Sequence, residues 1–148
     1  MLLIQILMIR ATTQQDYARV CSLLQSESLP TIDIAKDLQH FFVKTIGGEI
    51  VGSIGMEQYG QSALLRSMIV NPAFRNQGIA SELVKTLTQY AQDRGVKNSF
   101  LITNTAEKYF QRFGFITIDK DLVEKAVLHS KEFNGLCPSS SAIMMKQL

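Results

Sequence analysis

The feature of this sequence that most constrains its fold is an apolar strand, a short polar loop and a long helix, which follow one another between residues 61 and 94. Residues 61–70, QSALLRSMIV, alternate as a strand does, and residues 78–94 have apolar side chains at helical spacing. Gly95 then favours the end of the helix. A strand that leads into an amphipathic helix predicts a mixed α/β fold. The apolar stripe of the helix consists of Ile79, Leu83, Val84, Leu87, Tyr90 and Ala91.

The remaining pattern predicts further strands around the same sheet. Gly47-Gly48 is a strong hairpin signal between two strands within residues 40–60. Gly52 and Gly55 in the second of these strands predict a bulge or a close backbone approach. We expect one domain spanning residues 1–148. Further strands are expected at 3–10, 96–104, 115–118 and 142–148, and further helices from about Thr13 to Leu24 and at 32–38, 105–113 and 121–133.

Composition and charge exclude several classes of function. A chain of 148 residues is long enough to bury a core. The net charge of +2 is too small to predict a nucleic-acid partner. The two cysteines, Cys21 and Cys137, have no metal-ligand spacing and form no disulfide framework, so we expect no metal and a reducing, cytoplasmic location.

The first residues, MLLIQILMIRATT, are apolar but do not predict a membrane segment. Crossing a bilayer takes about 20 apolar residues, and this stretch also lacks the basic start and cleavage site of a signal peptide. Met1 and Met8 both remain candidate start residues.

The loop between the strand and the long helix has the properties of an anion site. A helix N-terminus presents unpaired N–H groups and a partial positive charge. Gly78 allows a ligand to approach the backbone, Ala80 keeps the next position small, and Arg75 offers a guanidinium fork suited to phosphate. The loop therefore predicts a pyrophosphate cradle, although Asn71-Pro72 as a simple turn and Gly78 as a flexible joint are the alternative. Neither a Walker loop nor a dinucleotide fingerprint is present.

Two motifs give the chain a resemblance to a known family. Residues 75–80, RNQGIA, match the R/Q-x-x-G-x-G/A signature of the GCN5-related N-acetyltransferases. Residues 101–115, LITNTAEKYFQRFGF, resemble the later strand-helix segment of that family, including its final Gly114-Phe115 pair. The pattern is most similar to small amino-acid acetyltransferases of the arsenic-resistance-linked branch and to N-acetylglutamate synthase domains. The resemblance implies the acyl-CoA N-acyltransferase fold, in which helices flank a mixed, mostly antiparallel sheet.

The resemblance also implies acetyl-coenzyme A as the cofactor. Its pyrophosphate would lie on the backbone amides of the loop, and its pantetheine arm would follow the preceding strand where the neighbouring strands splay apart. The thioester would then lie beside the strand that ends at Asn104, with the helix at 105–113 flanking the thiol. The cofactor-binding residues implied in this way are Met68, Ile69, Val70, Arg75, Asn76, Gln77, Gly78, Ile79, Ala80, Ser81, Asn104 and Phe110.

Acetyl transfer to an amine requires that the amine lose its proton. An α-ammonium group has a pKa of about 7.7–8.0, so a modest base suffices, while backbone N–H groups can stabilise the oxyanion. The resemblance implies Glu57 as the base, because it ends the glycine-rich strand at the position from which the family often supplies a carboxylate. Its alternative role is that of a solvated glutamate at a strand end. The general acid is a tyrosine in many relatives. Phe110 occupies the aligned position here, and Tyr109, about 100° away around a helix, is the candidate.

Arg66 interrupts an otherwise apolar strand. A charge in such a run is costly unless it is paired or faces a cavity. Arg66 is therefore a candidate to bind the carboxylate of a substrate, and the alternative is an ion pair with a nearby acid.

Taken with the resemblance, the sequence predicts an acetyl-CoA-dependent N-acetyltransferase that acts on a small-molecule amine by direct attack on the thioester. An amino acid or an analogue, such as an arsinothricin-like glutamate mimic, is the expected acceptor. The alternatives are a protein or peptide N-acetyltransferase and a non-catalytic acyl-CoA-binding sensor. Dimers formed through the last strands are common in similar proteins, so a homodimer is a further expectation.

Overall fold

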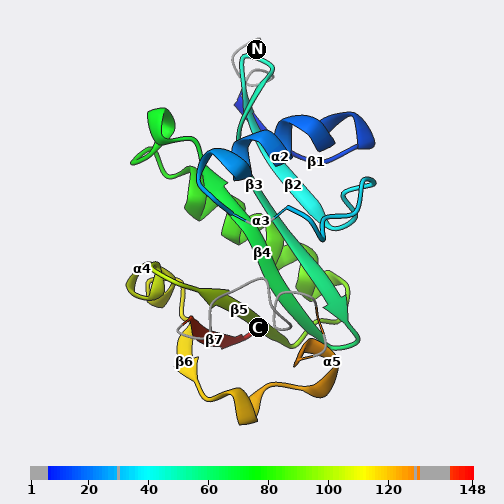
Figure 1. Cartoon of the computed structure of the whole chain (residues 1–148), viewed down its shortest axis with the longest axis vertical. Coiled ribbons are helices and arrows are strands. Elements are labelled where there is room, and N and C mark those ends of the chain that lie inside the picture. Colours follow the sequence, from blue (N-terminus) through cyan, green and yellow to red (C-terminus); the bar gives the residue numbers. More distant parts are fainter. Residues whose placement is uncertain (1–6, 30, 129, 131–140) are drawn as a thin grey trace. The chain divides into compact units, whose positions relative to one another are not determined.

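The computed structural model describes residues 7–29, 31–128, 130 and 141–148. In this part of the chain the strands form a seven-stranded sheet with the hydrogen-bonding order β1-β2-β3-β4-β5-β7-β6 (Figure 1). The pairing of β4 with β5 is parallel, and the other pairs with a described register are antiparallel. The prediction of a mixed, mostly antiparallel α/β fold is confirmed. The strands are β1 (Leu7–Ala11), β2 (Phe41–Ile46), β3 (Glu49–Tyr59), β4 (Ser62–Val70), β5 (Asn98–Thr103), β6 (Ile116–Ile118) and β7 (Ala142–Gln147).

The helices agree with the expected ones in part. The long helix after the polar loop is confirmed, with its start and end each within one residue of the prediction, whereas the helix expected at 32–38 is wrong. That segment forms turns, and Leu38 adopts a φ of +50°, which no right-handed helix accommodates. The helices are η1 (Gln14–Asp16), α2 (Tyr17–Ser26), η2 (Pro72–Phe74), α3 (Ile79–Asp93), α4 (Glu107–Gln111), η3 (Lys120–Leu122) and α5 (Lys125–Leu128).

The helix expected at 121–133 is interrupted within its described part. Val123 has an extended backbone, with ψ of 135°, and separates η3 from α5. The side chain of Val123 is buried, so the break lets it pack into the core beside Val127. Residues 129 and 131–133 of that prediction lie outside the described residues.

Two compact units can be separated in the chain, Met1–Met56 with Ser67–Gln89 and Glu57–Arg66 with Tyr90–Leu148. Both β3 and β4 run from one unit into the other. The expectation of a single domain over residues 1–148 stays a prediction.

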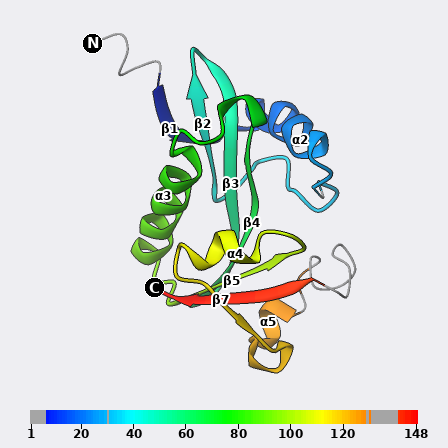
Figure 2. The same ribbon diagram turned by 90° about the vertical axis from the view of Figure 1, so that its left-hand side faces the viewer.

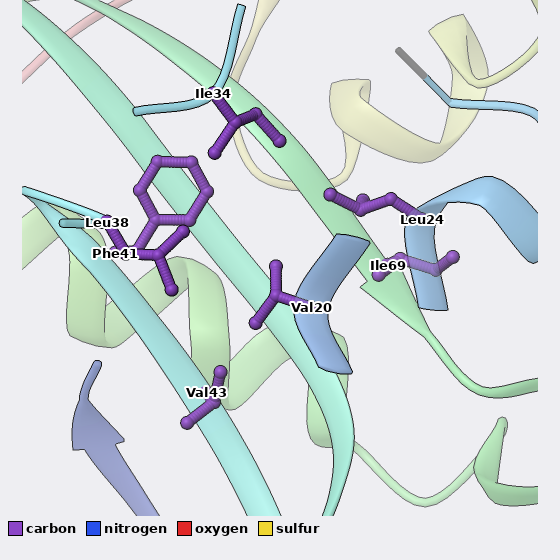
Figure 3. Packing of buried hydrophobic residues seen from close by; sticks show 7 residues of the cluster. All are labelled: Val20, Leu24, Ile34, Leu38, Phe41, Val43 and Ile69. Carbon is purple, nitrogen blue, oxygen red and sulfur yellow. The ribbon is translucent and has the colours of Figure 1, made fainter. Parts of the chain in front are cut away.

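In the first unit, α2 and α3 cover opposite faces of β2. Val43 packs against Val20 of α2, whereas the next residue, Lys44, forms an ion pair with Glu82 of α3. Successive side chains of a strand point to opposite faces, so the two helices lie on different sides (Figure 2). The apolar cluster on the α2 side, shown in Figure 3, contains Val20, Leu24, Ile34, Leu38, Phe41, Val43 and Ile69.

Gly52 and Gly55 of β3 lie where a bulge and a close approach were predicted. The register between β2 and β3 shifts at Lys44, which faces Gly52, and Thr45, which faces Ile50, so that one extra residue of β3 forms a bulge. At Gly52, a Cβ atom would lie 3.1 Å from the backbone oxygen of Ile69, and at Gly55 it would lie 2.6 Å from the ring of Phe41. The bulge and the close approach are therefore both confirmed.

In the second unit, β5 and β7 lie side by side along their whole length (Figure 2). Phe100 of β5 and Leu64 of β4 pack against Val127 of α5, which gives this unit its own apolar cluster. In neither unit does a described helix have the length and hydrophobicity required to cross a membrane.

Candidate functional site

The loop after β4 is fixed at its start by two hydrogen bonds. The Asn71 N–H donates to the Val51 carbonyl of β3 at 2.7 Å. The Asn71 side chain in turn accepts a hydrogen bond from the Ala73 N–H at 3.0 Å, and Pro72 begins the turn η2. The predicted Asn71-Pro72 turn therefore exists and anchors the loop that follows it to β3.

The second half of the loop presents a series of backbone N–H groups that continues into the start of α3. Asn76 and Gly78 adopt left-handed conformations, with φ of +65° and +79°. Such turns collect successive N–H groups into a concave surface that suits an anion. Within the described part of the chain, the backbone N–H groups of residues 76–81 donate no hydrogen bond. A Cβ atom at Gly78 would meet nothing within 4 Å, so its backbone conformation, not a contact, calls for glycine.

Arg75 is engaged by the protein itself. Its guanidinium donates to the Glu27 carboxylate at 2.9 Å and to the Val70 carbonyl at 3.3 Å. Glu27 is the C-terminal cap of α2, so this ion pair braces the loop against that helix. The side chain of Arg75 is still about half exposed, but in this structure it points to a carboxylate.

The strand before the loop is kinked where the pantetheine arm was expected. The parallel ladder between β4 and β5 ends at Leu64 and Phe100, after three residue pairs. Ser67 then has a left-handed φ of +56°, and its carbonyl accepts a hydrogen bond from the Ser53 hydroxyl at 2.9 Å. Of the next residues, Met68 and Val70 are half-buried and Ile69 lies in the core of the first unit.

Glu57 and Arg66 come together in the second unit. Arg66 Nη1 donates to Glu57 Oε1 at 3.3 Å, and the Tyr59 hydroxyl donates to the other carboxylate oxygen at 3.1 Å. The Arg66 side chain is only 2% exposed, whereas that of Glu57 is 34% exposed. A buried guanidinium thus holds a carboxylate that solvent still reaches.

The residues expected near the thiol lie on or beside α4. Phe110 is buried, and its ring meets that of Phe115 edge-on, with 5.9 Å between the ring centroids. Tyr109 packs on Phe113, and desolvation raises the pKa of its hydroxyl, against a smaller opposing effect of Arg112. Asn104 follows β5 and accepts a hydrogen bond from the Ser141 hydroxyl.

Two residues of this region were missed by the sequence reasoning. Tyr59 lies two positions after Glu57 and so shares its face of the strand, but nothing in the sequence indicated that its hydroxyl bonds to the carboxylate. Ser53 is a single hydroxyl in an apolar strand, and its partner comes from another strand, so no local signal exists. Cys137 lies outside the described residues.

A family model described as "Acetyltransferase (GNAT) family" matches residues 8–115. Among curated proteins, Acetyltransferase ECA0875 of Pectobacterium atrosepticum is 27% identical over 139 residues, which cover 84% of this chain and 99% of that protein. The match to the family model includes the loop at 71–81, the strand before it and the helix after it.

Solved structures resemble the fold at low sequence identity. N-acetylglutamate synthase from Neisseria gonorrhoeae, complexed with coenzyme A and N-acetyl-glutamate, gives a TM-score of 0.82 at 17% identity over 96% of this chain. This chain spans only 35% of the length of that synthase chain. Rv2747 from Mycobacterium tuberculosis, in complex with CoA and NLQ, gives 0.80 at 21% identity and covers 95% of this chain and 99% of its own. Arabidopsis thaliana Naa50, in complex with the bisubstrate analogue CoA-Ac-MVNAL, gives 0.74 at 13% identity over 97% of this chain and 99% of its own.

Proposed function

The chain belongs to the acetyltransferase (GNAT) family, and we propose that it transfers the acetyl group of acetyl-coenzyme A to the amine of a small molecule, an amino acid or an amino-acid analogue. The observation that carries this proposal is the loop at 76–81, where consecutive backbone N–H groups have no acceptor among the described residues.

The chemistry of this loop fits the pyrophosphate of coenzyme A. Unpaired N–H groups at the start of the 15-residue helix α3 carry partial positive charge. The left-handed conformations of Asn76 and Gly78 bring the N–H groups of neighbouring residues to one side of the loop. The backbone amides of residues 76–81 would therefore bind the phosphate oxygens. The Ser81 hydroxyl, in the first turn of α3, would bind them as well. Arg75 would add charge to the site only by leaving Glu27.

The backbone of β4 would bind the pantetheine arm, which is itself amide-like and can pair with a strand. Residues Met68–Val70 follow the end of the β4–β5 ladder, so that ladder does not use their backbone groups. When bound, acetyl-coenzyme A supplies an activated acyl group as a thioester. Backbone N–H groups of β4 would stabilise the negative charge that develops on the carbonyl oxygen.

Glu57 would act as the base. Its partly exposed carboxylate can take a proton from the incoming ammonium group, directly or through water. The neutral amine would then form the C–N bond while the C–S bond breaks with its electron pair on sulfur, and the second proton of the nitrogen would pass to solvent water. Arg66 holds Glu57 in place, and its predicted contact with a substrate carboxylate stays a prediction.

Tyr109 would be the acid that protonates the departing thiolate. A phenol with its ordinary pKa of about 10 keeps its proton at neutral pH, and desolvation raises the pKa of Tyr109 further. A thiol in water has a pKa of about 8.5, however, so the thiolate can also leave without this help. At the thiol end of the cofactor, Phe110 would provide apolar packing and Asn104 would provide a polar side chain.

An amino acid is the acceptor that the similarities support best. The fold resembles a synthase complexed with N-acetyl-glutamate, although the likeness to Naa50 with a peptide-containing analogue makes a peptide N-terminus the second candidate. Cytoplasmic location and a homodimer stay predictions.

Release of coenzyme A from acetyl-CoA tests the proposal. The purified chain is incubated with acetyl-CoA and a panel of free amino acids that includes glutamate and its phosphorus and arsenic mimics, with peptides bearing different N-termini as a second panel. We expect turnover with at least one free amino acid. Turnover with peptides alone would transfer the assignment to the second candidate, and binding of acetyl-CoA without turnover on any amine would overturn the enzymatic proposal in favour of a sensor.

A further inference from the structure

A side-chain hydrogen bond between β3 and β4 holds the kink in β4. The Ser53 hydroxyl donates to the Ser67 carbonyl at 2.9 Å, and Ser53 itself is fully buried. Ser53 pairs with Val43 of β2, so its side chain lies on the same face of the sheet as Val43. The Ser53 hydroxyl is therefore a polar group on the face of the sheet where α2 covers the apolar core.

Ser67 is the single residue of the described strands that combines a side chain with a left-handed φ, here +56°. The other residues of this kind in the described chain lie in turns or loops. L-residues rarely adopt this conformation, and it persists only where the surroundings determine it. The bond from Ser53 is one such determinant, because it gives the carbonyl of the unusual residue a donor inside the core.

The geometry of the peptide group converts this bond into an orientation for the next amide. The bond between Ser67 and Met68 is trans, since the described chain contains no cis peptide bond. In a planar trans peptide the C=O and N–H groups point in opposite directions. Because the Ser67 carbonyl points to the Ser53 hydroxyl, the Met68 N–H points away from it.

We propose that Ser53 is a positioning residue for acetyl transfer, which fixes the Ser67–Met68 peptide so that the Met68 N–H polarises the thioester carbonyl. This inference rests on the proposed function and extends it to a buried residue that touches neither substrate. A donor must lie at the place where charge develops, and a small displacement of such a donor reduces the rate strongly. Ser53 would fix the position of the Met68 N–H by holding the Ser67 carbonyl on the opposite side of the same peptide group.

Ser62 provides a matched control. It is also fully buried and lies on β4, but its hydroxyl has no hydrogen-bond partner among the described residues. Ser62→Ala and Ser53→Ala therefore remove the same atom from equally buried positions, and only the second removes a hydrogen bond to a backbone carbonyl.

The kinetic test compares both variants with the natural chain, using the amine that the panel identifies. We expect Ser53→Ala to lower kcat about 10- to 100-fold, with the KM for acetyl-CoA within about threefold, because the pyrophosphate loop is untouched. Ser62→Ala should keep kcat. If Ser53→Ala does not fold, the near-isosteric Ser53→Cys, whose thiol is a weaker donor, should give an intermediate kcat. An unchanged kcat in whichever Ser53 variant folds would overturn the inference.

A second readout is independent of turnover. In amide NMR spectra of the protein without ligand, the Met68 resonance should move in Ser53→Ala and remain in place in Ser62→Ala. Acetyl-CoA should shift that resonance in the natural chain, and by less in Ser53→Ala. A Met68 resonance that neither the substitution nor acetyl-CoA moves would overturn the inference.

These measurements separate the two levels of the proposal. If acetyl-CoA binds but no amine is acetylated, the proposed function fails while the NMR comparison still decides whether Ser53 orients Met68. If the natural chain turns over and Ser53→Ala matches it in kcat, the function stands and the positioning role is wrong.

Discussion

The loop at 76–81 and the Glu57–Arg66 pair are built in opposite ways. The loop offers backbone N–H groups, and the basic side chain just before it, Arg75, is already bound to Glu27 at the surface. The pair consists of side chains, with a guanidinium that is 2% exposed and a hydroxyl from Tyr59 on the second carboxylate oxygen. Binding of a common cofactor can rely on the main chain, whereas proton transfer requires a specific side chain held by others.

This difference predicts where substitutions act. Changes in the Glu57–Arg66 pair should alter turnover and stability, because both depend on particular side-chain atoms. Changes in the loop should matter where they alter the backbone and have little effect where they alter only a side chain. The following substitutions test the contrast, in order of decreasing expected effect.

The largest effect is expected for Glu57→Gln. Removing a general base typically costs a factor of 10² to 10⁴, so we expect kcat/KM to fall about 100-fold, with a flatter pH profile. Coenzyme A release at several pH values measures this. Glu49→Gln, at the exposed start of the same strand, is the control and should retain activity. Equal turnover of Glu57→Gln and the natural chain at all pH values would remove Glu57 from the role of base.

Arg66→Ala should cost about 2 kcal/mol of unfolding free energy, since it removes a charged hydrogen bond and leaves buried space. Arg75→Ala breaks an exposed pair and should cost less than about 1 kcal/mol. Denaturant titration of both variants measures the difference. Equal losses would contradict the contrast between the two regions. An unchanged KM of Arg66→Ala for its amino acid would separately refute the predicted contact with a substrate carboxylate.

Gly78→Ala should weaken coenzyme A binding about tenfold, because alanine disfavours the left-handed backbone on which the cradle depends. Gly47→Ala is matched to it, since Gly47 also has a positive φ, of +60°, and open space for a Cβ, but lies in the β2–β3 hairpin. Both variants should lose about 1 kcal/mol of stability, and only the first should lose affinity in calorimetry. The cradle assignment is wrong if both bind coenzyme A alike.

The smallest effect is expected for Arg75→Ala on coenzyme A affinity. Main-chain recognition predicts a loss of about threefold at most, since Arg75 must also give up Glu27 in order to bind phosphate. Glu27→Gln, which releases Arg75, should leave affinity equal or slightly higher. A loss of a hundredfold in Arg75→Ala would show that the arginine, and not the backbone, carries phosphate binding.

Much of the fold followed from local patterns. The hairpin at Gly47-Gly48, the bulge near Gly52 and the limits of α3 are set by residues close together in the chain, and all are confirmed. The segment at 32–38 misled the prediction because its apolar residues, Ile34 and Leu38, pack into the core from turns. Spacing alone does not separate a short helix from turns that bury the same side chains.

The candidate site was predictable to a lesser degree. The sequence indicated Glu57 and Arg66 separately, and named an ion pair for Arg66 only as an alternative to a substrate contact. Which acid lies nearby depends on β3 and β4 becoming neighbours, so the pair with Glu57 required the structure. The same reason hid the partner of Arg75, because Glu27 is far away in sequence.

By itself, the sequence determined the strand, loop and helix between residues 61 and 94, the glycine at the start of that helix and the family to which the chain belongs. These depend on short-range preferences of the backbone and on the periodic burial of apolar side chains. Only the tertiary structure decided that Arg66 holds Glu57, that Arg75 is bound to Glu27 and that Ser53 supports the kink at Ser67. Each of these contacts joins separate segments of the chain, and a polar side chain acquires its partner only when packing brings those segments together.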